Sequence, residues 1–234
     1  QNVLLLAGIM CIFTVFILSK EDNQYKLGIK LNTHYLNENE LRDFYNESIK
    51  SRSYIVQKYV TSRNLQGDPF DCRIHVEKNG KGEWESAINY IRIGVGQTVT
   101  SNVGQGGGIG NVEPFLKANF GDKWSELKEG IDDIASTLPY KIEELRQTHI
   151  MSLGIDIGID KNGDFYLFEV NDGPGTAYIE SDVAFLRSNY YKYVLENVLN
   201  LNIKPKKKLP KNTKLVKKMK TIENERERCK KKLR

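Results

Sequence analysis

The stretch Gly154–Gly175, GIDIGIDKNGDFYLFEVNDGPG, decides the fold, because it is typical of a single β-hairpin. Asn162-Gly163 lies between two strand-like runs and predicts a two-residue type I′ turn, since both residues tolerate positive φ. With that turn, Asp156 stands opposite Glu169. Asn171 follows two residues later and shares their face of the sheet.

The three polar residues of this hairpin predict a metal site. Two carboxylates directly opposite each other destabilise a sheet unless a cation lies between them. Oxygen donors such as Asp156, Glu169 and Asn171 suit Mg²⁺ or Mn²⁺. The run Phe165–Phe168 is apolar on both faces, which predicts burial where the acids converge. A half-exposed strand with a solvated face is the alternative, and we favour the metal site.

Composition is that of a globular protein with an unevenly distributed charge. A chain of 234 residues can form one large domain or two small lobes. Residues 204–234 contain fifteen Lys and Arg against three Glu, a net charge of +12, so residues 1–203 carry about −7 of the total of +5. The three cysteines, Cys11, Cys72 and Cys229, show no CxxC spacing, which indicates a reducing compartment and no zinc site.

The basic tail, residues 204–234, has two open interpretations. It is either a mobile, solvated segment or a contact with an anionic surface. Nucleic acid is the disfavoured partner, because the tail has no aromatic residue to stack on bases.

The most apolar run is VLLLAGIMCIFTVFIL at residues 3–18. A helix of that length spans about 24 Å, less than the roughly 30 Å of the hydrocarbon core of a bilayer. We therefore favour two buried strands, Val3–Leu6 and Phe13–Leu18, joined by a bend near Gly8. A membrane anchor formed by residues 3–18 is the alternative.

The remaining periodicities predict three helices and three strands. The expected helices are Asn37–Ile49, Val112–Leu138 stopped by Pro139, and Asp182–Leu201; the expected strands are Tyr54–Val60, Phe70–Glu77 and Glu83–Ile93. In the second of these strands Asp71, Arg73 and His75 alternate with apolar residues and share one side. An Arg on that side suits phosphate, and a surface Arg paired with Asp71 or another acid is the alternative. The glycine-rich stretch Thr100–Gly110 indicates a flexible loop.

The order of these segments resembles the catalytic half of the ATP-grasp superfamily, most closely its YheC/YheD-like endospore coat-associated branch. The resemblance covers roughly Tyr54–Leu201, and it rests on these stretches: YIVQKYV (54–60), FDCRIHV (70–76), SNVGQGGG (101–108), GIDIGID (154–160) and FYLFEVNDGPG (165–175). The E-x-N followed by PG is its most specific part. The resemblance implies an α+β fold of antiparallel sheets with packed helices and a truncated or degenerate N-terminal part.

Three parts of the chain follow from the resemblance. Residues 1–60 would be an incomplete nucleotide-clamping lobe that ends in a hinge strand, residues 61–203 the C-terminal ATP-grasp lobe with the metal site, and residues 204–234 a mobile tail. The implied location is cytoplasmic or spore-associated.

The resemblance also assigns roles to matching residues. Asp156, Glu169 and Asn171 would bind two Mg²⁺ ions that bridge ATP phosphates. Backbone groups of Tyr59 and Val60 would hold adenine, with Gln57 and Lys58 beside it. Arg73 would contact phosphate or the acyl phosphate, and Ser101 and Asn102 would lie by the phosphates, with Arg73 and Asn102 catalytic.

The implied reaction is carboxylate activation. ATP would phosphorylate a small-molecule or peptide carboxylate, and an amine acceptor would attack the acyl phosphate. The segment LAGIMCIFT at residues 6–14 has no Lys and one Gly, where relatives have a strand with Lys-Pro and a glycine-rich phosphate loop. A catalytically degenerate module, acting as a nucleotide-binding or structural coat protein, is therefore the alternative.

Overall fold

The computed structural model describes residues 3–7, 15–29, 32–51, 54–95, 107–177 and 179–201. The chain divides into two compact units, Gln1–Lys192 and Tyr193–Arg234. The predicted bend near Gly8, the sites Ser101 and Asn102, and the tail at 204–234 lie outside the described residues. The division into lobes at residues 60 and 203 stays a prediction.

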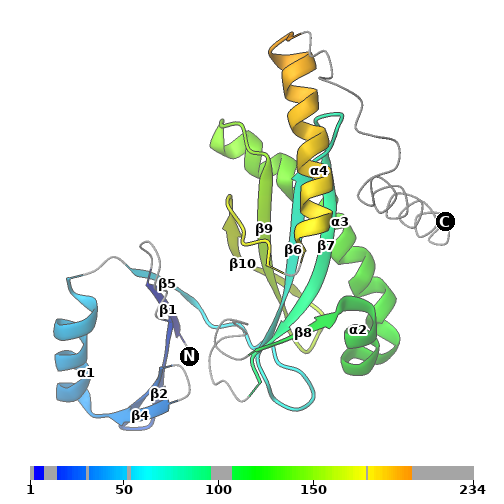
Figure 1. Ribbon diagram of the computed structural model, residues 1–234. Helices are drawn as coiled ribbons and strands as arrows, with labels where there is room; N and C mark the ends of the chain where they lie inside the picture. Colours follow the sequence, from blue (N-terminus) through cyan, green and yellow to red (C-terminus); the bar gives the residue numbers. More distant parts are fainter. Residues whose placement is uncertain are drawn as a thin grey trace. The chain divides into compact units, whose positions relative to one another are not determined.

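The first half of the larger unit contains a five-stranded antiparallel sheet in the order β4-β3-β2-β1-β5 (Figure 1). Its strands are β1 (Val3–Ala7), β2 (Val15–Glu21), β3 (Gln24–Ile29), β4 (Asn32–Leu36) and β5 (Tyr54–Lys58). The prediction of strands within residues 3–18 is confirmed by β1 and β2, and these strands exclude a single helix that runs through all of residues 3–18. Among the described residues, no helix is long and apolar enough to cross a membrane.

The predicted helix at residues 37–49 is confirmed as α1 (Glu38–Phe44), which continues as a π-helical turn, η1 (Tyr45–Ile49). It begins at Asn37, whose side chain accepts hydrogen bonds from the backbone of Asn39 and Glu40. The Glu40 carboxylate in turn accepts a hydrogen bond from the Asn37 N–H, which completes a capping box. Phe44 then packs edge-on against Phe16 of β2, with ring centroids 5.2 Å apart.

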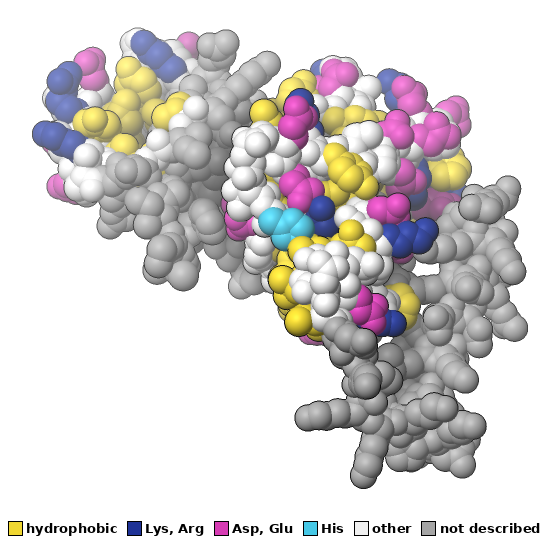
Figure 2. All heavy atoms as spheres, turned by 90° about the horizontal axis from the view of Figure 1, so that it is seen from above, with side chains coloured by type: hydrophobic (Ala, Val, Ile, Leu, Met, Phe, Trp, Pro, Cys, Tyr) yellow, Lys and Arg dark blue, Asp and Glu magenta, His cyan; other side chains and the backbone are white. Residues whose placement is uncertain are grey.

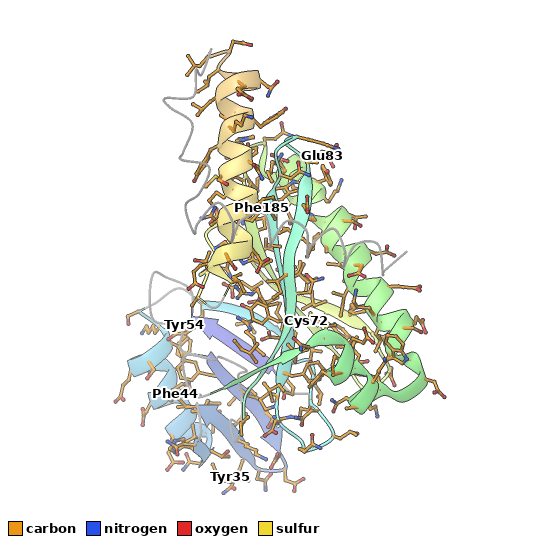
Figure 3. All side chains as sticks on the ribbon, turned by 45° about the vertical axis from the view of Figure 1, so that its right-hand side comes forward. Tyr35, Phe44, Tyr54, Cys72, Glu83 and Phe185 are labelled. Carbon is orange, nitrogen blue, oxygen red and sulfur yellow. The ribbon has the colours of Figure 1, made fainter. Side chains whose placement is uncertain are left out.

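The second half contains another five-stranded antiparallel sheet, in the order β10-β9-β6-β7-β8. Its strands are β6 (Phe70–Lys78), β7 (Trp84–Ile93), β8 (Gly108–Asn111), β9 (Ser152–Ile159) and β10 (Phe165–Asn171). The helices are α2 (Val112–Phe120), the 3-10 turn η3 (Gly121–Lys123), α3 (Trp124–Arg146) and α4 (Glu180–Tyr193), which continues as the π-helical turn η4 (Val194–Val198). Helices α3 and α4 lie on opposite faces of the sheet (Figures 1 and 3). The predicted α+β fold of antiparallel sheets with packed helices is confirmed.

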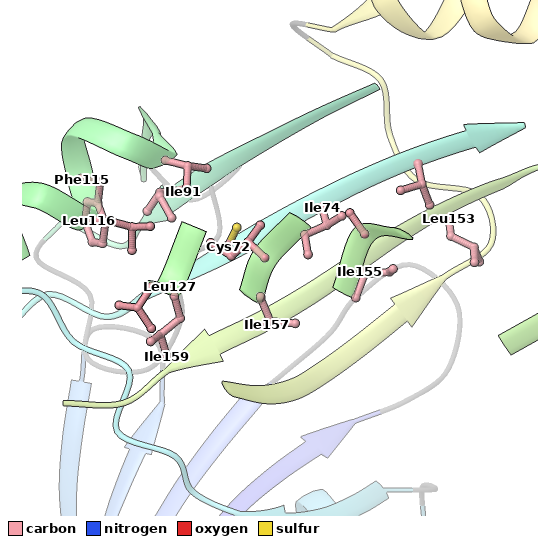
Figure 4. Packing of buried hydrophobic residues seen from close by; sticks show 14 of the residues in the cluster. Cys72, Ile74, Ile91, Phe115, Leu116, Leu127, Leu153, Ile155, Ile157 and Ile159 are labelled. Carbon is pink, nitrogen blue, oxygen red and sulfur yellow. The ribbon is translucent and has the colours of Figure 1, made fainter. Parts of the chain in front are cut away.

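Strict alternation along the two central strands builds the core. The odd-numbered residues of β9 and the even-numbered residues of β6 face α2 and α3, as Figure 4 shows. They are Cys72, Ile74, Val76, Leu153, Ile155, Ile157 and Ile159, and each is at most 1% exposed. Burial raises the pKa of the Cys72 thiol well above its ordinary value, so this cysteine, labelled in Figure 3, is a core residue and no nucleophile.

The prediction that Pro139 stops the second helix is wrong, because α3 continues to Arg146. A proline inside a helix lacks the N–H for one backbone hydrogen bond. Pro139 is nevertheless buried on the stripe that it shares with Leu127, Ile131 and Ala135. Packing of this stripe against the sheet outweighs the lost hydrogen bond, as tertiary contacts often override propensity.

The predicted two-residue type I′ turn at Asn162-Gly163 is also wrong. Asp160 donates its N–H to the Asp164 carbonyl at 3.1 Å, and Gly163 donates to the Asp160 carbonyl at 3.0 Å. Gly163 has a φ of 93°, whereas Asn162 does not enter the positive-φ region. This pattern is that of a three-residue loop, a type I turn followed by a glycine with positive φ.

The same loop recurs twice in the chain, at Asn64–Asp68 and Asn79–Glu83. In each copy the fourth residue is a glycine whose N–H donates to the first carbonyl at 3.0 Å. The side-chain oxygen of the first residue accepts hydrogen bonds from the third and fifth N–H groups. The shared sequence, Asn or Asp, two residues, Gly, then Asp or Glu, therefore determines the loop.

A β-bulge restores the register that the longer loop would otherwise change. Next to the loop Phe165 pairs with Ile159, but the register shifts between Leu167 and Glu169. Glu169 consequently stands opposite Asp156, as predicted. The predicted burial of Phe165–Phe168 is wrong, because β10 is an edge strand and Leu167 is 50% exposed.

We expect Gly67→Ala to lower the free energy of unfolding by about 1–2 kcal/mol, because Gly67 has a φ of 87° and an added Cβ would meet no atom within 4 Å. The change therefore isolates the backbone penalty of the recurring loop. Gly173→Ala is the matched control, since its Cβ also meets nothing and its φ lies outside the positive region. Urea unfolding measures both variants, and equal stabilities would contradict the assignment.

Candidate functional site

One face of the central strand β6 carries only polar side chains. Asp71, Arg73, His75 and Glu77 alternate with the core residues, and all four are buried. Antiparallel pairing places Arg73 opposite Asp156 of β9 and Asp71 opposite Arg92 of β7. Four charged residues from three neighbouring strands therefore meet on this face.

A continuous ion network is formed by Asp71, Arg73, Arg92 and Asp156. Arg73 binds Asp156 through two parallel contacts, Nε to Oδ1 and Nη2 to Oδ2, the second at 2.8 Å. Arg92 binds Asp71 in the same manner, with distances of 2.7 and 2.9 Å. The Nη2 of Arg92 also lies 2.8 Å from Oδ2 of Asp156, which joins the two pairs.

The network has no net charge, since it contains two carboxylates and two guanidinium groups. Burial alone would lower the pKa of Arg92, but the carboxylates of Asp71 and Asp156 raise it above its ordinary value. Arg92 is therefore a permanent cation. Removing one partner from such a buried pair typically costs about 3–5 kcal/mol, because the remaining charge is left unpaired.

The predicted metal ligands lie on the same face. Glu169 stands opposite Asp156, and Asn171 stands opposite Gly154. Glu169 is exposed and has no ion-pair partner among the described residues. Their oxygen donors fit Mg²⁺ in kind, although both oxygens of Asp156 already contact guanidinium groups. A cation at Asp156 therefore competes with these guanidinium groups for the carboxylate.

Within the described residues, no group of three or more His, Cys, Asp or Glu side chains is arranged to hold a metal ion. The predicted set contains two such residues, because its third member is Asn171. The metal assignment of Asp156, Glu169 and Asn171 therefore stays a prediction supported by register and donor type.

The predicted adenine-binding residues lie at and beyond the end of β5. Gln57 and Lys58 pair with Leu4 and Val3 of β1, and their side chains lie outside what the structure describes. Tyr59 and Val60 are half-buried, and the Val60 carbonyl accepts the Ser62 N–H at 3.1 Å.

Ser62 attaches this segment to the second sheet. Its hydroxyl donates to the Phe70 carbonyl at 2.7 Å and accepts the Ile159 N–H at 3.1 Å. The residues that follow the predicted hinge are thus fixed to the ends of β6 and β9.

Sequence reasoning missed Arg92, because the hairpin predicted around KNGKG does not by itself give the partner of Asp71. Next to the loop Lys78 pairs with Trp84, and this register, continued along the strands, would place Ile91 opposite Asp71; a shift between His75 and Val76 brings Arg92 there instead. The alternative that paired Arg73 with Asp71 or another acid is confirmed for the pairing, because Arg73 binds Asp156 while Asp71 pairs with Arg92. Its placement of Arg73 at the surface is wrong, since Arg73 is buried.

A second buried network, also missed, occupies the other end of the same face. Glu77 accepts hydrogen bonds from Ser152 at 2.7 Å and from Arg187 of α4 at 2.6 and 3.1 Å. His75 Nε2 lies 2.9 Å from the same carboxylate. Burial alone would raise the pKa of Glu77, but hydrogen bonds from His75, Arg187 and Ser152 hold it below its usual range.

A cavity of about 350 Å³ lies elsewhere, between β2, β3 and α1. Its lining is mostly apolar and includes Leu18, Leu41 and Phe44. Its charged lining residues, Glu38 and Arg42, form an exposed ion pair and not a buried one, so the polar face of β6 is the better candidate site.

The protein family to which the chain belongs is identified by a match to one family model. The model described as YheC/D-like ATP-grasp matches residues 7–201. The chain belongs to the YheC/YheD-like ATP-grasp family. The match includes the ion network on β6, β7 and β9, and also both strands of the β9–β10 hairpin.

Two curated relatives in this ATP-grasp branch come from Bacillus subtilis (strain 168). The endospore coat-associated protein YheD is 29% identical over 125 residues, which are 52% of this chain and 26% of YheD. The endospore coat-associated protein YheC is 24% identical over 129 residues, which are 55% of this chain and 35% of YheC. The matches thus span about a quarter of YheD and about a third of YheC.

Among solved structures, the chain is similar to the C-terminal domain of Pby1 from K. lactis, an ATP-grasp enzyme that interacts with the mRNA decapping enzyme Dcp2. The identity is 13% and the TM-score 0.44, with 91% of this chain and 63% of the other covered. The family assignment rests on the family model alone.

The low pKa of Glu77 predicts acid sensitivity. Because the folded state lowers this pKa, the ionised carboxylate adds stability above the ordinary carboxylate pKa, and this stability is lost as pH falls through the native pKa. We expect Glu77→Gln to be less stable than wild type near about pH 6, with the difference shrinking toward about pH 3. Chemical unfolding across this range measures it.

The matched control is Glu38→Gln, which removes a carboxylate from the exposed surface of α1. A difference between wild type and Glu77→Gln that stays constant with pH would refute the assigned role of the carboxylate.

Proposed function

We propose that this chain is an ATP- and Mg²⁺-dependent carboxylate-activating ligase domain of the YheC/YheD-like ATP-grasp family. The observation that carries the proposal is the alignment of Arg73, Asp156 and Glu169 on three neighbouring strands. It places a guanidinium group, a buried carboxylate and an exposed carboxylate in one row. A guanidinium group can bind phosphate oxygens, and the two carboxylates can bind Mg²⁺.

The reaction proceeds in two steps. The γ-phosphoryl group of ATP passes to a carboxylate oxygen of the substrate, which gives an acyl phosphate and ADP. An amine then attacks the acyl carbon, phosphate leaves with the C–O bond pair, and the amine loses a proton. When bound, Mg²⁺ supplies charge neutralisation to the phosphates.

We assign the following roles to individual residues of this chain. Arg73 stabilises negative charge on the transferred group. Asp156 and Glu169, with Asn171, hold the cation, and backbone groups of Tyr59 and Val60 hold adenine, with Gln57 and Lys58 beside it. Ser101 and Asn102 complete the phosphate side. The carboxylate and amine substrates are small molecules or peptides.

The proposed setting is the spore coat or cell envelope, since the curated relatives are named as endospore coat-associated proteins. In the space-filling view of Figure 2, acidic and basic side chains are intermixed on the visible face of the described residues. The exposed ion pairs Lys117–Glu113 and Lys141–Glu144 each join opposite charges at the surface. We therefore place any contact with an anionic surface in the basic tail.

Nucleotide binding should depend on Mg²⁺ through Glu169. We expect Mg²⁺ to strengthen ATP binding at least about tenfold, and Glu169→Gln to abolish most of this gain, because it removes an anionic ligand of the cation. Isothermal titration calorimetry with and without Mg²⁺ measures both. Asp172→Asn is the matched control, since Asp172 is an exposed acid on the same segment and pairs with Arg146. An equal Mg²⁺ effect in wild type and Glu169→Gln would exclude this site.

Release of ADP and phosphate separates the ligase from a degenerate nucleotide-binding or structural module. The full chain is incubated with Mg²⁺, ATP and mixtures of carboxylates and amines. Carboxylate-dependent phosphate release supports the ligase, whereas ATP binding without any release supports the degenerate module.

A further inference from the structure

The two arginines of the ion network are held differently. Arg92 contacts two carboxylates, with two hydrogen bonds to Asp71 and one ion contact to Asp156. Among the described residues, the only carboxylate that Arg73 contacts is that of Asp156. Loss of the Asp156 contact therefore leaves Arg92 paired and leaves Arg73 unpaired.

The surroundings of Arg73 leave room for its guanidinium group because Gly154 has no side chain. A Cβ added at Gly154 would lie 2.9 Å from Arg73 Nη1 and 2.7 Å from the Cβ of Pro174. Gly154 is the residue of β9 that stands opposite Asn171, one of the proposed metal ligands. The guanidinium group thus lies over the strand that carries Asp156, on the face where the phosphates are proposed to bind.

We propose that Arg73 is an exchangeable anion-binding group that leaves Asp156 for a phosphate group of the ligand, while Asp71 clamps Arg92 so that Arg92 stays on Asp156. The proposal rests on the proposed function and assigns Asp71 and Arg92 as positioning residues. Arg92 keeps Asp156 Oδ2 in place, and the departure of Arg73 frees Oδ1 for a cation.

This arrangement couples the two halves of the site. Without a cation, the carboxylate of Asp156 competes with the phosphate for the Arg73 guanidinium group. A phosphate group therefore binds weakly on its own, because it must displace a charged hydrogen-bond partner. Occupation of Asp156 by a cation removes the competitor, and by linkage each ligand strengthens the other.

Side-chain NMR on the wild-type protein tests the asymmetry directly. The Nε–H groups of Arg73 and Arg92 both donate to carboxylates, so each gives a resonance that Arg73→Lys and Arg92→Lys assign by its disappearance. On titration with pyrophosphate in EDTA, we expect the Arg73 resonance to shift and the Arg92 resonance to stay. The proposal would be overturned by a shift of the Arg92 resonance alone, by equal shifts of both resonances, or by no shift of either resonance at saturation.

Binding of pyrophosphate to variants supplies a second test. In EDTA, we expect Asp156→Asn to bind pyrophosphate about tenfold more tightly than wild type, because the competing carboxylate is gone. Asp156→Asn/Arg73→Gln should lose this gain, and Asp156→Asn/Arg92→Gln should keep most of it. Thermal unfolding of each variant confirms that it is folded, and the NMR titration decides the question for any variant that is not.

The matched control is Asp160→Asn, which makes the same charge change on the same hairpin. Asn already performs the role of Asp160 in the loops that begin at Asn64 and Asn79, so this variant keeps its turn and should bind like wild type. A gain in Asp160→Asn equal to that in Asp156→Asn would sink the exchange mechanism, since net charge alone would explain it. Mg²⁺-dependent ATP binding without these effects refutes the exchange alone, whereas absence of nucleotide binding with Mg²⁺ refutes the proposed function.

Discussion

The pairing of Asp156 with two arginines is the constraint on which the rest of the second sheet depends. β6 and β9 lie at the centre of the sheet, with helices on both faces. A side chain that points to the polar face is therefore buried: Asp71 is 6% exposed and Arg73 9%. An ionised Asp156, 4% exposed, is tolerable there only because guanidinium groups neutralise it. A slip of one residue in either strand would place that charge against the isoleucines of the core.

Local hydrogen bonding fixes the register that this pairing requires. The loop at Asp160–Asp164 is closed by its own backbone and by the Asp160 side chain, so it sets the first pair of the hairpin independently of the ions. Taken alone, its register would leave Asp156 without Glu169 opposite it. The bulge at Phe168 corrects this by one residue. The Phe168 ring then covers Gly158, where an added Cβ would lie 2.1 Å away, so the bulge is also a packing feature.

The sequence allowed most of the strands, the helices and the facing of Asp156 and Glu169 to be predicted, because alternation and helical periodicity are local patterns. The strands β3, β4 and β8 were not predicted. The errors arose where a local signal had two solutions or where a distant contact decided. Asn-Gly suits a two-residue turn, but the preceding Asp160 selects the three-residue loop by accepting two backbone hydrogen bonds. A proline ends most helices, yet Pro139 lies on a buried stripe inside α3. Arg92 was missed because its role emerges only when β7 is aligned with β6 and β9 together. The adenine and phosphate residues are not tested by the described geometry.

The polar face of β6 shows how one repeating pattern supplies both a structural and a reactive part. At one end, His75 and Glu77 are at most 1% exposed, and Arg187 from α4 completes their network. Because α4 covers this end, His75 and Glu77 are fixed in place, and the contact of Glu77 with Arg187 serves to position α4. At the other end, the side chain of Arg92 is 17% exposed, and the exposed Glu169 stands across from Asp156. The same alternation of charged residues thus leads to different chemistry, because a helix closes one end of the face and the other end can exchange partners with a ligand.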